Sequence, residues 1–160
     1  MSIRKSAAVG AFLASLLLAS TAGVSHAQGG RASPLTTAKS IKCVFPLIST
    51  GTWEKDGTPK ADITPASMVL QYDEIDIQEG TAQVLGLSGR LYIITRLSGT
   101  NLHLLAIDSA GPLYITTVFD KPSRPGKFKA AHSRHEFTDI SLPGFTSRPE
   151  QYYGECEILK

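Results

Sequence analysis

Eight short runs of residues that favour β-strands follow one another along most of this 160-residue chain. Each run is rich in Val, Ile, Leu, Thr or Tyr and is bounded by residues that favour turns. We expect strands at residues 41–47, 68–77, 82–87, 91–97, 102–108, 113–119, 128–137 and 151–159. No segment after residue 27 places apolar residues at helical spacing over the length of a helix, so we expect an all-β fold.

The connections between these runs favour an antiparallel meander. Four links are short and polar, and each contains a glycine that a tight turn can use, at residues 78–80, 88–89, 98–100 and 109–112. Three links are longer and contain prolines, so we expect loops, at residues 48–67, 120–127 and 138–150. Closing such a meander into a β-barrel removes its unpaired edges, and a two-sheet β-sandwich is the alternative.

The first 27 residues have the composition of a secretory signal peptide. Arg4 and Lys5 form a basic start, an apolar run follows at residues 7–19, and Ser25-His26-Ala27 places small residues where signal peptidase reads them. The apolar run is shorter than the roughly 20 residues that a membrane-spanning helix needs. We therefore expect export to the periplasm or the medium after cleavage near Ala27, with Ser20-Thr21-Ala22 as the alternative cleavage site.

Two cysteines, Cys43 and Cys156, lie near the two ends of the expected mature domain. In an oxidising compartment such a pair indicates a disulfide bond. A bridge requires Cα atoms within about 7 Å, so the first and last strands must be neighbours. The chain is thus expected to hold a flexible segment at residues 28–40 and a single closed or nearly closed β domain at residues 41–160.

The charge balance argues against a nucleic-acid partner. Loss of Arg4 and Lys5 reduces the 16 basic residues to 14, which equals the 14 acidic residues. A general binder of nucleic acid or of anionic membranes would carry a basic excess. We expect neither a nucleic-acid partner nor stable membrane insertion of the mature chain. Residues 121–134 hold five basic and no acidic side chains, which indicates either a patch for an anionic ligand or a bipolar surface.

Alternation sets the expected faces of the strands. In the run at residues 68–77, Leu70 and Tyr72 share one face while Ile75 and Ile77 share the other. A bulge near residues 73–74 would reconcile them. Across the next strands, one apolar face is expected to hold Leu91, Ile93, Thr95, Leu97, Leu102, Leu104, Ala106, Leu113, Ile115, Thr117 and Phe119.

The run at residues 128–137 has no cleanly apolar face. Phe128 and Ala130 share a face with His132 and Arg134. If this face points inward, His132 and Arg134 enter the barrel near a mouth, where an Arg can hold an anionic group through two hydrogen bonds. The alternative is a solvated strand whose Arg and His pair with Glu136, Asp139 or the backbone. The candidate ligand-binding residues are His132, Arg134, Tyr114, Thr116 and Thr117.

No catalytic, metal or cofactor motif is evident in the sequence. His132 and His135 point to opposite faces of a strand and cannot chelate an ion together without a bend. Ser133 shares a face with His135, but no third member of a catalytic set is evident. We therefore expect a protein that is not an enzyme and that uses neither metal nor cofactor.

Two sets of residues resemble known proteins. Gly51-Thr52-Trp53 resembles the Gly-x-Trp signature of lipocalin and avidin barrels, where the Trp plugs one end. A broader set resembles a group of small exported bacterial proteins with no established activity, and this implies export and a disulfide-closed β domain. Its blocks are Cys43-Val44-Phe45, Trp53, Leu113-Tyr114-Ile115-Thr116-Thr117-Val118-Phe119, His132-Ser133-Arg134-His135 and Gln151-Tyr152-Tyr153-Gly154-Glu155-Cys156.

Two functions from different classes fit these observations. The first is a module of the cell envelope or secreted fraction that binds a small apolar or anionic ligand inside the barrel. The second is a structural or interaction protein that acts on an envelope or host protein through its long loops, including those around Trp53 and Phe145.

Overall fold

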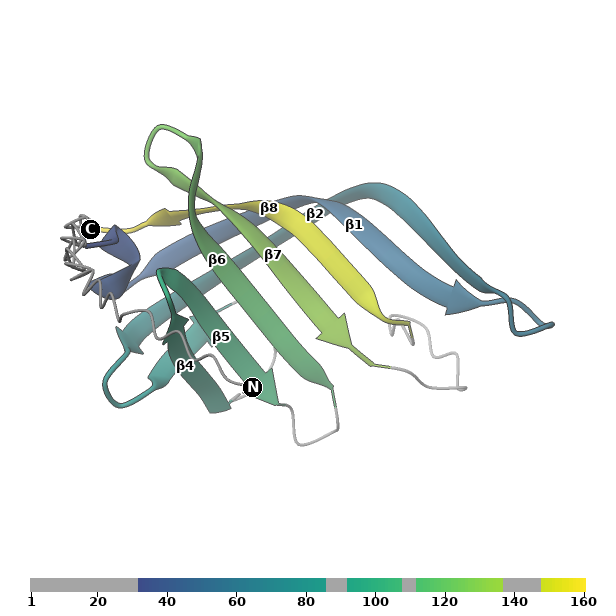
Figure 1. Cartoon of the computed structure of the whole chain (residues 1–160), viewed down its shortest axis with the longest axis horizontal. Helices are drawn as coiled ribbons and strands as arrows, with labels where there is room; N and C mark the ends of the chain where they lie inside the picture. The colour runs from purple at the N-terminus through teal and green to yellow at the C-terminus, as the bar shows by residue number, and fades with distance from the viewer. Residues whose placement is uncertain (1–31, 86–91, 108–111, 137–147) are drawn as a thin grey trace, which may run out of the picture. The chain divides into compact units, whose positions relative to one another are not determined.

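The computed structural model describes residues 32–85, 92–107, 112–136 and 148–160. All neighbouring strands pair antiparallel, in the order β3-β2-β1-β8-β7-β6-β5-β4 (Figure 1). The predicted all-β meander is therefore confirmed. The elements are a 3-10 helix, η1 (Pro34–Thr36), and the strands β1 (Ile41–Trp53), β2 (Pro59–Asp76), β3 (Thr81–Leu85), β4 (Tyr92–Ser98), β5 (Asn101–Ile107), β6 (Leu113–Arg124), β7 (Lys127–His135) and β8 (Glu150–Ile158).

The first and last strands of the chain lie side by side. β1 pairs with β8, and Cys43 lies directly opposite Cys156. The two sulfurs are bonded, the Cα atoms are 4.0 Å apart, and both residues are buried. The predicted disulfide and the predicted contact between the first and last strands are both present.

The two edge strands, β3 and β4, meet at a seam. Thr95 of β4 donates from its backbone N to the Gly80 carbonyl over 2.8 Å and from its Oγ1 to the Thr81 carbonyl over 3.0 Å. Gly80 has a φ of 75°, a conformation that favours glycine. The described strands thus form a nearly closed barrel with one unsealed seam, as predicted, and not two packed sheets.

Two segments that the sequence predicts to be loops are strands instead. The expected loop at residues 48–67 is a hairpin, because β1 continues to Trp53 and β2 begins at Pro59. The expected loop at residues 120–127 is also a hairpin, formed by β6 and β7. Pro65 and Pro122, two of the prolines that suggested loops, lie where the ladders are irregular: the register shifts next to Pro65 and on both sides of Pro122. Irregular positions tolerate the missing N–H of proline.

The third expected loop, at residues 138–150, is described in small part. Residues 148–149 precede β8, which begins at Glu150, and residues 137–147 lie outside the described residues. The expected signal peptide at residues 1–27 also lies outside them.

The predicted bulge in β2 is confirmed. Glu74 has a φ of 52°, and the pairing of β2 with β3 shifts between Asp73 and Asp76. This irregularity brings Tyr72 and Ile75 to the buried side of the strand, with 3% and 1% of their surfaces exposed.

The segment before β1 differs from the expected flexible segment at residues 28–40. Its described part, from residue 32 onward, contains η1, and Leu35 of this turn is fully buried in the core. Ser33 caps the turn, because its Oγ accepts a hydrogen bond from the Leu35 N over 3.2 Å. Backbone carbonyls of Lys39 and Ser40 also accept hydrogen bonds from Ile75 and Leu159. Burial of Leu35 and these hydrogen bonds offset part of the entropy that the segment loses when it is ordered.

The two ends of the barrel differ in the side chains that they hold. The chain enters at Ile41 and leaves near Ile158 at one end, which we call the apolar end; its side chains include Leu35, Ile41, Leu102, Val118, Phe128 and Ile158. At the opposite end β7 finishes and β6 and β8 begin. We call this the polar end; its inward side chains include Tyr114, Arg134, Glu150 and Tyr152.

Candidate functional site

The inner face of β7 is the one that its apolar residues predicted. Ala130 and His132 are buried, and Phe128 packs against the core. Arg134 lies on the same face, two residues further toward the polar end. The chain therefore places a histidine and an arginine inside the barrel.

The expected inner face of β6 is wrong. Register pairs Thr116 with Leu104 and Val118 with Leu102, so Thr116 and Val118 share the inner face with these leucines. Both are fully buried, whereas Phe119 is 36% exposed. The prediction took the more apolar face of β6 as the inner one, and that face lies outside; it consists of Leu113, Ile115, Thr117 and Phe119. The inner face carries polar side chains that take part in hydrogen bonds inside the barrel.

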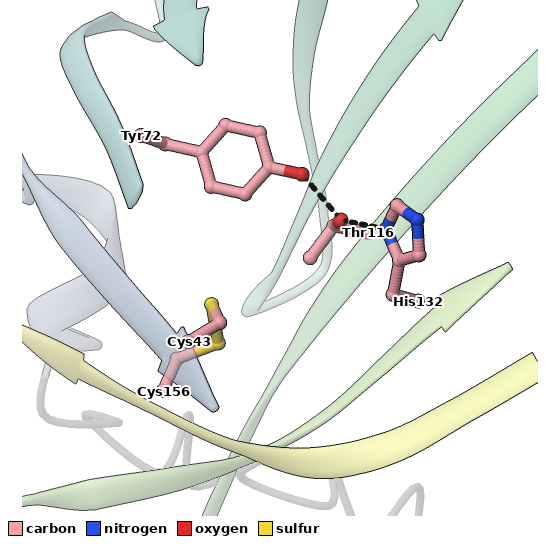
Figure 2. The surroundings of a disulfide bond; sticks show 5 residues. All are labelled: Cys43, Tyr72, Thr116, His132 and Cys156. Carbon is pink, nitrogen blue, oxygen red and sulfur yellow. Dashed lines mark hydrogen bonds between the residues drawn. A yellow bond between two sulfur atoms is a disulfide. The ribbon is translucent and has the colours of Figure 1, made fainter. Parts of the chain in front are cut away.

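Three buried polar side chains form a hydrogen-bonded series inside the barrel. The Tyr72 hydroxyl lies 2.5 Å from Thr116 Oγ1, which in turn lies 2.7 Å from His132 Nδ1. Figure 2 shows the series crossing from β2 to β6 and β7, beside the disulfide of Cys43 and Cys156. Burial raises the pKa of Tyr72 to about 12, so its hydroxyl keeps its proton at neutral pH.

Aromatic rings surround the His132 imidazole. The ring centroids of Phe45, Tyr114 and Tyr152 lie 5.9, 6.0 and 5.8 Å from the His132 centroid, with Tyr114 stacked. Burial, aided by the charge of Arg134, lowers the pKa of His132 to about 4. His132 is therefore uncharged at neutral pH and acts as a hydrogen-bonding group.

An ion-paired group lies next to this series at the polar end. Arg134 forms a salt bridge with Glu136, and its Nη1 lies 3.9 Å from Glu150 Oε2. Its guanidinium carbon also lies 5.9 Å from the centroid of the Tyr114 ring. Glu150 is 4% exposed and accepts a hydrogen bond from the Tyr152 hydroxyl over 2.7 Å. Burial and the bond to Glu150 raise the pKa of Tyr152.

Four of the five predicted ligand-binding residues come together, namely Tyr114, Thr116, His132 and Arg134. Thr117 does not join them. It lies on the outer face, where its Oγ1 is 3.0 Å from Nδ1 of His103. The salt bridge between Arg134 and Glu136 is the pairing that the alternative interpretation of this strand expected. The positive charge of Arg134 is therefore already balanced by a carboxylate.

Sequence reasoning missed Tyr72, Glu150 and Tyr152. A signal for two of them existed, because counting back by twos from the buried Cys156 gives Gly154, Tyr152 and Glu150 on one face. Alternation places Tyr72 beside Leu70, but it does not indicate a polar contact, because the partner Thr116 is 44 residues away.

The remaining candidates lie apart from this group. His135 is exposed on the opposite face of β7 from His132, as expected. No cluster of three or more His, Cys, Asp or Glu side chains that could hold a metal occurs among the described residues. Trp53 ends β1 and is 54% exposed, so it does not plug the barrel as the tryptophan of the Gly-x-Trp signature would.

No protein family, curated protein or solved structure was found to match this chain. Within the described ranges, no helix has the length and apolar character that crossing a membrane requires.

Proposed function

We propose that this chain is exported and binds a small molecule inside its barrel. The observation that supports this best is the series of Tyr72, Thr116 and His132, each at most 3% exposed. Burying polar groups is unfavourable unless they are bonded, and aliphatic side chains would fill these positions with less cost. Convergent polar groups among aromatic rings are typical of ligand sites, and an eight-stranded barrel is wide enough for one small ligand.

Export is supported by the N-terminal pattern and by the disulfide. Bridges of this kind persist in oxidising compartments. The intact mass of protein recovered from the periplasm or medium should correspond to a chain that begins at Gln28 with both cysteines oxidised. Recovery of full-length protein with free thiols from the cytoplasm would contradict export.

The charges at the polar end favour an uncharged ligand over an anionic one. Arg134 could hold an anion, but Glu136 is paired with it and Glu150 lies 3.9 Å away. An anionic ligand would have to compete with these carboxylates for one guanidinium. An apolar ligand with a few polar atoms meets no such competition.

A matched pair of variants tests the ligand-binding proposal. Thr116→Val and Thr117→Val make the same change on the inner and outer faces of β6. Compounds are extracted from protein purified from its own compartment, identified by mass spectrometry, and returned to stripped protein. We expect them to raise the Tm of the wild type and of Thr117→Val but not of Thr116→Val. An empty extract, or equal shifts in both variants, would contradict the proposal.

A second candidate, an interaction protein, is favoured by an apolar patch on the outer face. The outer apolar patch consists of Val44, Leu47, Val69 and Tyr153, which are between 37% and 47% exposed. Register places Val44 opposite Val69 and Leu47 opposite Tyr153, so the patch spans β2, β1 and β8. Patches of this kind mark interaction surfaces. Crosslinking in cells should then give an adduct with an envelope or host protein that Leu47→Lys abolishes; an adduct that persists would exclude this patch.

A further inference from the structure

His132 is a buried polar side chain whose hydrogen bonding within the barrel is incomplete. The residue is 2% exposed, and its Nδ1 bonds to Thr116 Oγ1. Among the residues that the structure describes, Nε2 of the same ring has no hydrogen-bond partner. Nε2 does not belong to the fully buried side-chain atoms that lack a partner in the described residues, so it keeps some accessible surface on which a bound molecule can contact it. A bound molecule that supplies the missing partner would therefore gain affinity from this nitrogen.

The series of hydroxyls determines which ring nitrogen carries the proton. If Tyr72 donates to Thr116 and Thr116 donates to Nδ1, both hydroxyl hydrogens are used and only Nε2–H is left over. If Nδ1–H donates to Thr116 instead, one hydroxyl hydrogen and the Nε2 lone pair both lack partners among the described residues. The first arrangement leaves one unmatched group and the second leaves two, so the first is more stable.

We infer that His132 is held as the Nε2–H tautomer and that this N–H donates a hydrogen bond to an acceptor atom, such as a carbonyl oxygen, of an uncharged ligand inside the barrel. Tyr72 and Thr116 are then positioning residues, because they act on the ligand through the His132 ring. The inference rests on the proposed ligand-binding function and names the class of ligand.

The surroundings of His132 oppose a charge of either sign on the ligand. The rings of Phe45, Tyr114 and Tyr152 offer apolar surfaces around the imidazole. The low pKa of His132 shows that this environment disfavours added positive charge. Added negative charge meets the carboxylates of Glu136 and Glu150, which already surround Arg134. Desolvating a charged ligand here would be costly.

The tautomer can be tested without any ligand. Long-range ¹H–¹⁵N correlation spectra of the ¹⁵N-labelled protein distinguish a protonated ring nitrogen from an unprotonated one. We expect a proton on Nε2 and none on Nδ1 of His132, with mixed tautomers in Thr116→Val and no change in Thr117→Val. A proton on Nδ1 in the wild type would overturn the inference.

The ligand class is tested with three molecules that share a ring. Acetophenone offers a carbonyl acceptor, benzoate carries a negative charge, and ethylbenzene has neither. We expect acetophenone to shift the His132 Nε2–H signal, ethylbenzene to leave it unmoved, and benzoate to bind at least tenfold more weakly than acetophenone.

The outcomes separate this inference from the proposed function. Tighter binding of benzoate than of acetophenone would overturn the inference. So would an Nε2–H signal that responds to none of the three molecules, because this N–H would then contact water alone. If compounds extracted from the protein still raise its Tm in that case, the proposed function stands alone. If no compound is extracted and none of the three binds, the proposed function fails as well.

Discussion

The two ends of the barrel differ in what fills them. At the apolar end, Leu35, Ile41 and Leu102 are fully buried, and the disulfide ties the nearby strands together. At the polar end, Arg134, Glu150 and Tyr152 bond to one another. Apolar burial stabilises by about 25 cal/mol per Å², whereas a buried hydrogen bond contributes only about 1 kcal/mol net. We therefore expect the apolar end to supply most of the stability and the polar end to supply specificity.

The largest expected effect is at the apolar end. The double variant Cys43→Ala/Cys156→Ala opens a loop of 113 residues, and the chain-entropy relation gives a loss of about 5 kcal/mol as an upper value. Urea unfolding followed by circular dichroism measures the change. The His132 tautomer of the remaining folded protein should be unchanged, because the substitutions leave the hydrogen bonds of Tyr72, Thr116 and His132 in place. A loss below about 1 kcal/mol would show that the bridge adds little to an already closed sheet.

Gly154 tests the region between the two ends. A Cβ at this position would overlap the Val44 carbonyl oxygen and lie 2.8 Å from Phe45 Cα. Because backbone must move to admit it, Gly154→Ala should lower the free energy of unfolding by about 3 kcal/mol. Gly51→Ala is the control, since its nearest contact is Pro149 O at 3.8 Å. Equal effects of the two variants would contradict the close approach of β8 to β1.

The pH dependence of stability tests the polar end. The pKa of His132 falls from its ordinary 6.5 to about 4 on folding, so between these values the unfolded chain binds a proton that the folded chain does not. Stability is therefore complete above pH 6.5 and is lost as pH falls to 4, by about 3 kcal/mol. The same titration of His132→Gln should lack this part of the loss. Parallel curves for the two proteins would show that His132 titrates normally.

The smallest expected effect separates the inner face from the outer face. Thr116→Val leaves the Tyr72 hydroxyl and His132 Nδ1 without their partner, which should cost about 2 kcal/mol. Thr117→Val removes only a bond to His103 on the outer face, and about 0.5 kcal/mol is expected. Chemical unfolding of both variants makes the comparison, and a larger loss in Thr117→Val would reverse our assignment of the faces of β6.

The sequence predicted the number of strands, the bridge and the bulge in β2, because turns, cysteines and alternation are local signals. It did not predict that β1 and β2 extend into a hairpin, since the pairing of the two strands overrides the turn preference of Pro59 and Pro65. The predicted inner face of β6 is wrong for another reason. Alternation cannot tell which face is inner when the inner one holds Tyr114 and Thr116, whose partners lie on β2 and β7.

Native mass spectrometry of protein recovered from its own compartment tests the proposed ligand binding inside the barrel most directly. We predict that the wild type and Thr117→Val carry the additional mass of one small uncharged molecule, and that folded Thr116→Val does not. A clean apo mass for all three proteins would contradict the account, because the buried series of Tyr72, Thr116 and His132 would then serve the barrel alone.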